Sequence, residues 1–316
     1  MTRFALIATL VATLVAAPAA AQRTFSDPSQ TRLITDDIPR FWTAFDARST
    51  LGSTLAFDSL YIKPGSRGLR DWTKLRLDSA GALGRTVDWA ATYYASARAS
   101  TLRIHDAEPA IRASFEKLAA LYRNARFPDV YFLIGRLSSG GTTSDAGLLI
   151  GAEMYGRTDS ASLVGLTDWM RQVLRPVEDV PGIVAHELIH FQQGQSGRTL
   201  LDQSLREGSA DFIGELISGM NINAHVHAWV RAVPQRERDL WSEFEQAMDG
   251  TNTANWFSST NVQERPKDLG YYMGYRIAQA YYESAADKRD AIREILTIRN
   301  AHDFLKTSRY AERFTR

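Results

Sequence analysis

Cysteine is absent from the 316-residue chain. No disulfide can therefore stabilise the fold, and no thiolate can bind a metal ion or act as a nucleophile. Any metal site must use histidine, aspartate and glutamate side chains, and the chain contains only 6 histidines. An excess of charge is lacking too, because 37 Lys and Arg residues balance 36 Asp and Glu residues. This balance argues against a nucleic-acid partner, which would require a concentrated basic surface.

Apolar runs long enough to span a membrane are also lacking. The longest one, Phe4 to Ala17, is shorter than the roughly 18 to 20 residues that a spanning helix needs. Arg3 precedes this run, and small residues after it offer an Ala-x-Ala cleavage site that ends at Ala21. This pattern predicts a signal peptide at residues 1–21. We therefore expect a periplasmic or secreted protein without a stable membrane anchor after cleavage.

The rest of the chain has a globular composition, with 44% hydrophobic and 10% aromatic residues. Residues 22–126 are predicted to form a helical region, in which Pro39 and Pro109 lie in first helical turns. Residues 127–316 are predicted to form the catalytic region. No Pro/Gly-rich linker separates the two regions, so one compact domain is the simpler interpretation and a boundary near Phe127 is the alternative.

Two short apolar runs, residues 130–134 and 147–155, have the length and composition of strands. The Gly/Ser/Thr-rich segment between them, residues 138–145, is predicted to be a loop. A phosphate-binding loop is the alternative for its glycines, but the Lys and Ser or Thr that such a loop requires do not follow. The expected fold is α+β and predominantly helical, with a small sheet and a helical N-terminal layer.

The segment AHELIH, residues 185–190, carries the chemistry. Asp179 is predicted to cap its helix, with Pro181 in the first turn. His186 and His190 are four residues apart, so both imidazoles can reach one ion from a single helix face. Glu187 is rotated away from the two histidines and can act as a general base that accepts a proton from a water molecule on that ion. An ordinary polar helix with two exposed histidines is the alternative interpretation.

A second helix, which begins near Leu201, offers the missing ligand. A catalytic zinc needs three protein ligands and one open position, and without cysteine the natural third ligand is a carboxylate. Glu207 follows His190 by 17 residues, which is enough for a loop and a returning helix. Asp211 lies one turn further and can accept the free ring N–H of a liganding histidine. The small residues 208–210 would let the two helices approach closely, although generic helix packing explains them equally well.

HELIH followed by EGSAD resembles the thermolysin-type zinc peptidases. More closely, residues 130–283 resemble a family of exported, predicted zinc-dependent proteases that is still classed as a domain of unknown function. That family combines an HELxH helix with EGxAD and a later Gly-Tyr-x-x-Gly-Tyr segment, which is GYYMGY at residues 270–275 here. The chain lacks recognisable similarity to thermolysin outside the site. The resemblance implies a zincin core of the gluzincin type, which binds one Zn²⁺ through His186, His190 and Glu207.

In that arrangement Glu187 would take a proton from the zinc-bound water and pass it to the leaving amine. Tyr271 and Tyr275, one helical turn apart, are the candidate donors to the developing oxyanion, with His225 and His227 behind them. Packing of aromatic faces is the alternative role for these tyrosines. By analogy with the fold type, residues 147–155 would form the edge strand that pairs with an extended peptide, and residues 140–144 would border the cleft.

The sequence therefore predicts an exported zinc metallopeptidase, a hydrolase that acts on a peptide or protein substrate. Two alternatives remain open at this stage. One is a non-catalytic envelope-binding or assembly protein that retains a zincin fold, and the other is a zinc hydrolase of non-peptide amides or esters.

Overall fold

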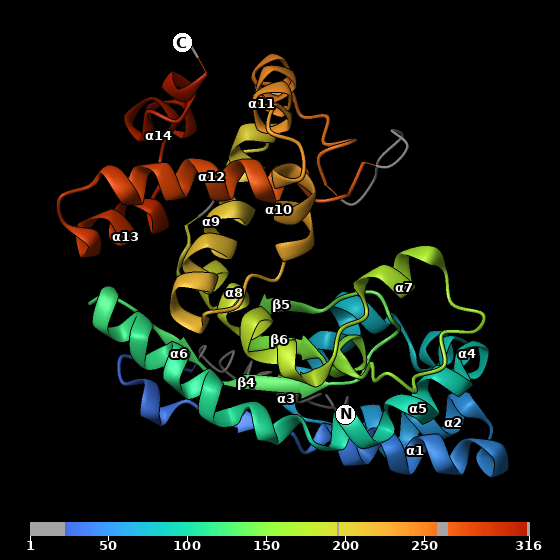
Figure 1. Cartoon of the computed structure of the whole chain (residues 1–316). Helices are drawn as coiled ribbons and strands as arrows, with labels where there is room; N and C mark the ends of the chain where they lie inside the picture. The colour runs from blue at the N-terminus through green and yellow to red at the C-terminus, as the bar shows by residue number, and fades with distance from the viewer. Residues whose placement is uncertain (1–22, 195, 258–264, 315–316) are drawn as a thin grey trace, which may run out of the picture.

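The computed structural model describes residues 23–194, 196–257 and 265–314. The predicted signal peptide, residues 1–21, lies outside the described residues. The structure is mostly helical with a small sheet, which confirms the predominantly helical α+β class (Figure 1). Within the described residues, no helix is long and apolar enough to cross a bilayer.

The strands are short and the helices vary from one turn to five. The strands are β1 (Thr24–Phe25), β2 (Leu33–Ile34), β3 (Phe127–Pro128), β4 (Val130–Leu133), β5 (Gly141–Ser144) and β6 (Gly147–Gly151). The helices before the sheet are α1 (Asp37–Leu51), α2 (Ser53–Phe57), α3 (Arg67–Trp72), α4 (Ala80–Trp89), α5 (Ala91–Leu102) and α6 (Glu108–Leu121). Those after it are α7 (Asp168–Val173), α8 (Val180–Gln192), α9 (Leu200–Ser218), α10 (Ala224–Arg231), α11 (Arg236–Ala247), α12 (Leu269–Ser284), α13 (Lys288–Leu296) and α14 (Ala301–Ser308).

The main sheet has the strand order β2-β4-β6-β5. β2, β4 and β6 run parallel, whereas β5 is antiparallel to β6 and forms the edge. The prediction that residues 147–155 form the edge strand was therefore wrong. β6 is central, and residues 152–155 leave the sheet as a helical turn. Its unbroken apolar run suits a strand that is buried on both faces, and every residue of β6 is buried.

The edge strand lies within the segment that was predicted to be a loop. Residues 141–144, Gly-Thr-Thr-Ser, form β5 and are half-buried along their whole length. Turn-forming residue types concealed this strand, because its side chains contribute little apolar surface. The loop prediction therefore missed a strand that borders helix α8 together with β6.

Helices α1 and α3 and the helix that carries the histidines cover opposite faces of the sheet, whereas α6 packs against α8 and α9 (Figure 1). α1 and α3 pack against β4, and α8 packs against β5 and β6. One continuous hydrophobic core connects these layers. Its largest fully buried side chains come from both predicted regions, and they include Trp72, Tyr61, Tyr93, Phe41, Phe127 and Phe244. The N-terminal layer is therefore part of the support of the site.

Helix α8 is buried on all sides, because every residue from Val180 to Ile189 is buried. A helix that packs on a sheet on one side and on a helix on the other has this composition. Pro181 lies in the first turn as predicted, but the side chain of Asp179 makes no cap hydrogen bond. The predicted capping role of Asp179 was therefore wrong.

Helix α9 has strong end signals and lies between α8 and α12. Thr199 and Asp202 form a reciprocal capping box at its start, and Gly219 ends it in the left-handed conformation. Gly208 was expected to help α9 approach α8, but it faces α12. A methyl group on Gly208 would lie 2.1 Å from the backbone nitrogen of Tyr275, and one on Gly274 would lie 1.6 Å from the carbonyl oxygen of Ser204. The second glycine of GYYMGY therefore sets the spacing between α9 and α12.

We predict that Gly274→Ala destabilises the protein by roughly 1–3 kcal/mol, because the added methyl group forces the two helix backbones apart. Gly81→Ala, in helix α4, is the matched control. A methyl group there meets its nearest atom at 3.5 Å, and a helical Gly→Ala change is neutral or stabilising by about 0.5–1 kcal/mol. Urea denaturation measures both variants, and a Gly274→Ala variant as stable as Gly81→Ala would contradict this packing.

Candidate metal centre

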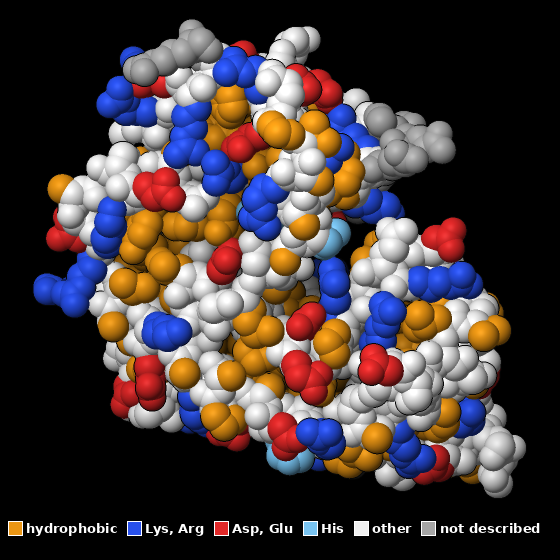
Figure 2. Space-filling model, viewed as in Figure 1, with side chains coloured by type: hydrophobic (Ala, Val, Ile, Leu, Met, Phe, Trp, Pro, Cys, Tyr) orange, Lys and Arg blue, Asp and Glu red, His pale blue; other side chains and the backbone are white. Residues whose placement is uncertain are grey.

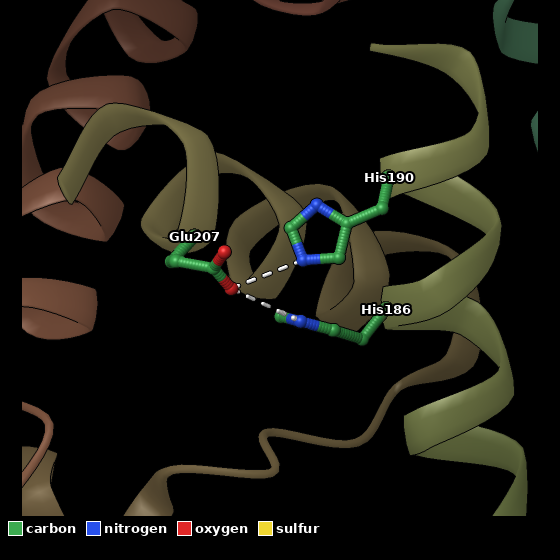
Figure 3. A group of neighbouring side chains, drawn as sticks. All are labelled: His186, His190 and Glu207. Carbon is green, nitrogen blue, oxygen red and sulfur yellow. Dashed lines mark hydrogen bonds and ion pairs between the residues drawn. The ribbon is translucent and has the colours of Figure 1, made fainter. Parts of the chain in front are cut away.

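Three side chains converge where α8 faces α9 (Figure 3). The carboxylate oxygen Oε2 of Glu207 lies 3.0 Å from Nε2 of His190 and 3.6 Å from Nε2 of His186. The two imidazole rings have centroids 4.5 Å apart and are nearly perpendicular. One ligand atom from each of the three residues lies within 4.8 Å of the other two. Two imidazole nitrogens and one carboxylate oxygen thus form a group that can hold a metal ion.

His186 is held from behind by Asp211, one turn beyond Glu207 on α9. Nδ1 of His186 lies 2.8 Å from Oδ1 of Asp211, and both side chains are almost fully buried. The second carboxylate oxygen of Asp211 accepts a hydrogen bond of 2.7 Å from Nδ2 of Asn223. These contacts turn Nε2 of His186 towards Glu207, and they suit the supporting role predicted for Asp211.

His190 has a different support, which the sequence did not reveal. Its Nδ1 lies 2.7 Å from Oε1 of Gln193. Nε2 of that amide donates to the carbonyl oxygen of Arg206 and to Oγ of Ser209, so the amide orientation is fixed. Oε1 is therefore an acceptor, Nδ1 of His190 carries a hydrogen, and Nε2 is left to face Glu207.

The surroundings shift the charges of the cluster. Burial acts to lower the pKa of His186, but the nearby carboxylates of Asp211 and Glu207 outweigh burial and raise it well above its usual value. Burial acts to raise the pKa of Glu207, but the charge of His190 and the close contacts with both histidines lower it far more. Glu207 is thus ionised at every pH at which the protein is expected to work. Cation binding at the shared point would displace protons from the imidazoles, so metal affinity must rise with pH.

Glu187 lies beside the triad and against the edge strand. Its side chain is buried, and burial raises the pKa of its carboxyl group, although the two histidines act in the opposite direction. Gly141 of β5 makes this packing possible, because a methyl group there would come within 2.8 Å of both Cγ and Oε1 of Glu187. A carboxylate with a raised pKa that faces a cleft is a stronger base than an exposed carboxylate.

Tyr271 is the tyrosine that reaches the site. Its ring stacks against His186 with centroids 6.2 Å apart, and it lines the same cavity as the triad. Burial raises the pKa of its hydroxyl well above the usual value, and the charge of Glu207 adds to the increase. The hydroxyl therefore stays protonated and can donate a hydrogen bond.

Tyr275 does not reach the cavity, which corrects the expectation that it donates to the oxyanion. Its hydroxyl donates a 2.8 Å hydrogen bond to Glu215, and its ring packs edge-on against Phe212 and His227. His227 is buried with the same rings, and burial lowers its pKa to about 4. His225 lies outside the main cavity, with Nδ1 3.3 Å from a guanidinium nitrogen of Arg175. The aromatic-packing interpretation therefore holds for Tyr275.

A cleft of about 500 Å³ contains the triad, Glu187 and Tyr271. This volume lies in the range typical of small-molecule and peptide sites. Residues 138–143 form one wall, in agreement with the expectation for residues 140–143, whereas Ser144 is not part of the lining. Figure 2 shows the molecule hollowed on this face, between the part that carries α7 and the part that carries α10 and α12. Apolar lining residues come from several elements and are Met154, Trp169, Val173, Ile183 and Ile222.

A buried carboxyl group anchors the backbone that leads to β5. Glu153 accepts hydrogen bonds from the backbone N–H groups of Gly135 and Leu137, at 2.8 and 3.2 Å. Burial raises its pKa to about 7, although these bonds act to lower it. Leu137 adopts a left-handed backbone conformation with φ of 56°, which Glu153 stabilises. Glu153 therefore fixes where the wall of the cleft begins, a role that its position in an apolar run concealed.

We predict that Gln193→Leu lowers zinc affinity about 10- to 100-fold, because His190 loses the acceptor that fixes its tautomer. Gln193→Glu keeps an acceptor at this position and should retain most of the affinity. Gln203→Leu is the control, since the side chain of Gln203 donates to the backbone of Arg198 at the surface and lies outside the cleft lining. Competition with a chromogenic chelator measures the affinities, and wild-type affinity in Gln193→Leu would exclude this role.

Comparisons of the chain with models of known protein families, with curated proteins and with solved structures find no significant match. The functional assignment therefore depends on the geometry of the cleft and on the sequence motifs. Both converge on the group formed by His186, His190 and Glu207.

Proposed function

We propose that the protein is an exported zinc metallopeptidase, with zinc bound by His186, His190 and Glu207. The observation that carries the proposal is the convergence of these three side chains within 4.8 Å in a cleft that also contains Glu187. Two histidines and a carboxylate, with room left for water, are the ligands of catalytic zinc in peptidases. Export is inferred from the predicted signal peptide at residues 1–21.

Zinc in such a site supplies acidity to a water molecule and polarises a carbonyl group. Glu187 is proposed to accept the proton from the attacking water and to return it to the leaving amine. Its buried position and raised pKa support this role, because a carboxyl with a pKa nearer neutrality both accepts and donates protons readily. Tyr271 is proposed to donate a hydrogen bond to the oxyanion, since its hydroxyl remains protonated.

Peptides are favoured over other amides and esters by the strand that lines the cleft. Thr142 and Thr143 of β5 belong to the cavity wall, and β5 pairs with β6 on one side only. In the described part of the chain no strand occupies its other side. An extended peptide can add to such an edge through backbone hydrogen bonds, which recognise the chain independently of its side chains.

Glu187→Gln is predicted to lower peptide hydrolysis by about 10²- to 10⁴-fold while zinc stays bound, because the amide cannot accept the proton. The measurement combines cleavage of a denatured peptide library with metal analysis of the same samples. Glu116→Gln, at an exposed position of α6, is the control and should leave both unchanged. An active Glu187→Gln enzyme would contradict the role of Glu187. A wild-type protein that binds zinc but cleaves no peptide or ester would favour the envelope-binding alternative.

His186→Ala is predicted to lose stoichiometric zinc as well as activity, since two ligands do not retain a catalytic ion. His302→Ala is the matched control, because His302 is exposed and lies 2.7 Å from Asp249 at the surface. Metal analysis of protein purified without chelator distinguishes the two variants. One equivalent of zinc in His186→Ala would place the ion elsewhere.

A further inference from the structure

The N-terminal layer contributes Arg76 to the lining of the cleft, and this residue has no counterion among the described residues. Arg76 belongs to the helical turn η3 (Thr73–Leu77) and lines the cleft together with Glu187 and the residues of β5. Its positive charge acts on Glu187 and lowers the pKa of that carboxyl group, though less than the two histidines do. Arg76 is therefore close to the proposed point of attack.

The guanidinium of Arg76 has few partners of its own. Its hydrogen bond within the described residues goes to the carbonyl oxygen of the neighbouring Leu75, at 3.2 Å. No described aspartate or glutamate lies within ion-pair distance of it. Arg136, a neighbour in space, donates to the carbonyl oxygen of Leu77 and does not line the cleft. Arg76 is thus half-buried in the cleft wall, and the described residues pair with few of its five donors.

The other charged residues of the cleft already have roles. Glu207 belongs to the metal site and Glu187 faces the attacking water. Arg206 lies 3.9 Å from Glu207 and donates to the carbonyl oxygen of Gly194. Asp268 lies near Glu207 and Asp211, and burial raises its pKa to about 6, with both carboxylates adding to the increase. Asp268 therefore lies on the side of the cleft that carries Glu207, and Arg76 lies on the side that carries Glu187.

We propose that Arg76 is a specificity-determining residue that binds a carboxylate of the substrate. Guanidinium groups recognise carboxylates through paired, charge-assisted hydrogen bonds, and the wall of a cleft strengthens them by excluding water. The ligand chemistry is a carboxylate, which an acidic side chain or a free C-terminus of the peptide can supply. The proposal rests on the proposed peptidase function, and it gives the N-terminal helical layer a part in substrate recognition.

The test uses matched peptides that differ in one carboxylate. A peptide cleaved by the wild type is prepared with Glu or Gln at each position within three residues of the cleaved bond, and with a free or an amidated C-terminus. We expect wild-type kcat/KM to favour one carboxylate by about tenfold or more. In Arg76→Gln this ratio should fall to near 1, and in Arg76→Glu it should invert. A general loss of activity cancels in the ratio.

Lys74→Gln is the matched control, because Lys74 is exposed in the same helical turn and does not line the cleft. It should keep the wild-type ratio. Arg76→Lys keeps the charge without the paired donors and should retain part of the preference. A preference for Glu over Gln that Arg76→Gln abolishes identifies an acidic side chain as the source of the carboxylate. A preference for the free C-terminus that Arg76→Gln abolishes identifies the C-terminus instead. Ratios in Arg76→Gln equal to those of the wild type in both pairs would overturn the proposal.

A binding measurement separates failure of this inference from failure of the proposed function. Zinc-loaded wild type and Arg76→Gln are titrated with acetylated peptide pools that contain either one Glu or one Gln, each prepared with a free or an amidated C-terminus. If the wild type cleaves nothing, the peptidase assignment fails, but tighter binding of the Glu pool or of the free C-terminus that disappears in Arg76→Gln still supports the carboxylate site. Equal binding within both pairs by the wild type would refute it.

Discussion

The approach of α9 to α8 is the constraint on which the centre depends. Glu207 meets the two histidines because α9 is fixed on both of its sides. On one side Gly208 and Gly274 bring its backbone against α12, and on the other side Asp211 and Gln193 connect it to the histidines. Backbone packing without side chains is suited to this task, since it leaves little freedom to slide.

The two histidines are supported in chemically different ways. Asp211 brings a negative charge to His186, whereas Gln193 brings a neutral amide to His190. A carboxylate strengthens the basicity of its histidine more than an amide does, and the amide adds links to α9 through Arg206 and Ser209. We infer that Asp211 acts mainly on the electronic character of the site and Gln193 mainly on its geometry.

Local features of the site were predictable from the sequence, and features that depend on distant packing were not. The spacing of His186 and His190 fixes their common face because helical geometry is local. The pairing of Asn223 with Asp211 requires a chain turn that no periodic pattern indicates. The pairing of Gln193 with His190 is local, but the amide is oriented by Arg206 and Ser209 of the next helix. The edge strand was missed because Gly-Thr-Thr-Ser has the composition of a loop.

Tyr271 and Tyr275 illustrate the same limit. Both lie on α12, one helical turn apart. The sequence does not indicate which of them faces the metal site. Tyr271 lies at the start of the helix, where it faces His186, whereas Tyr275 lies beyond the crossing with α9 and packs among Phe212 and His227. The position of the crossing, set by two glycines, decides which tyrosine can serve the cleft.

The centre itself is tested most directly by a crystal structure of zinc-loaded protein with anomalous diffraction recorded at the zinc absorption edge. We expect one strong peak, at about 2.0 to 2.2 Å from Nε2 of His186, Nε2 of His190 and a carboxylate oxygen of Glu207. A peak bound by other residues, or no peak in protein that contains stoichiometric zinc, would contradict the account.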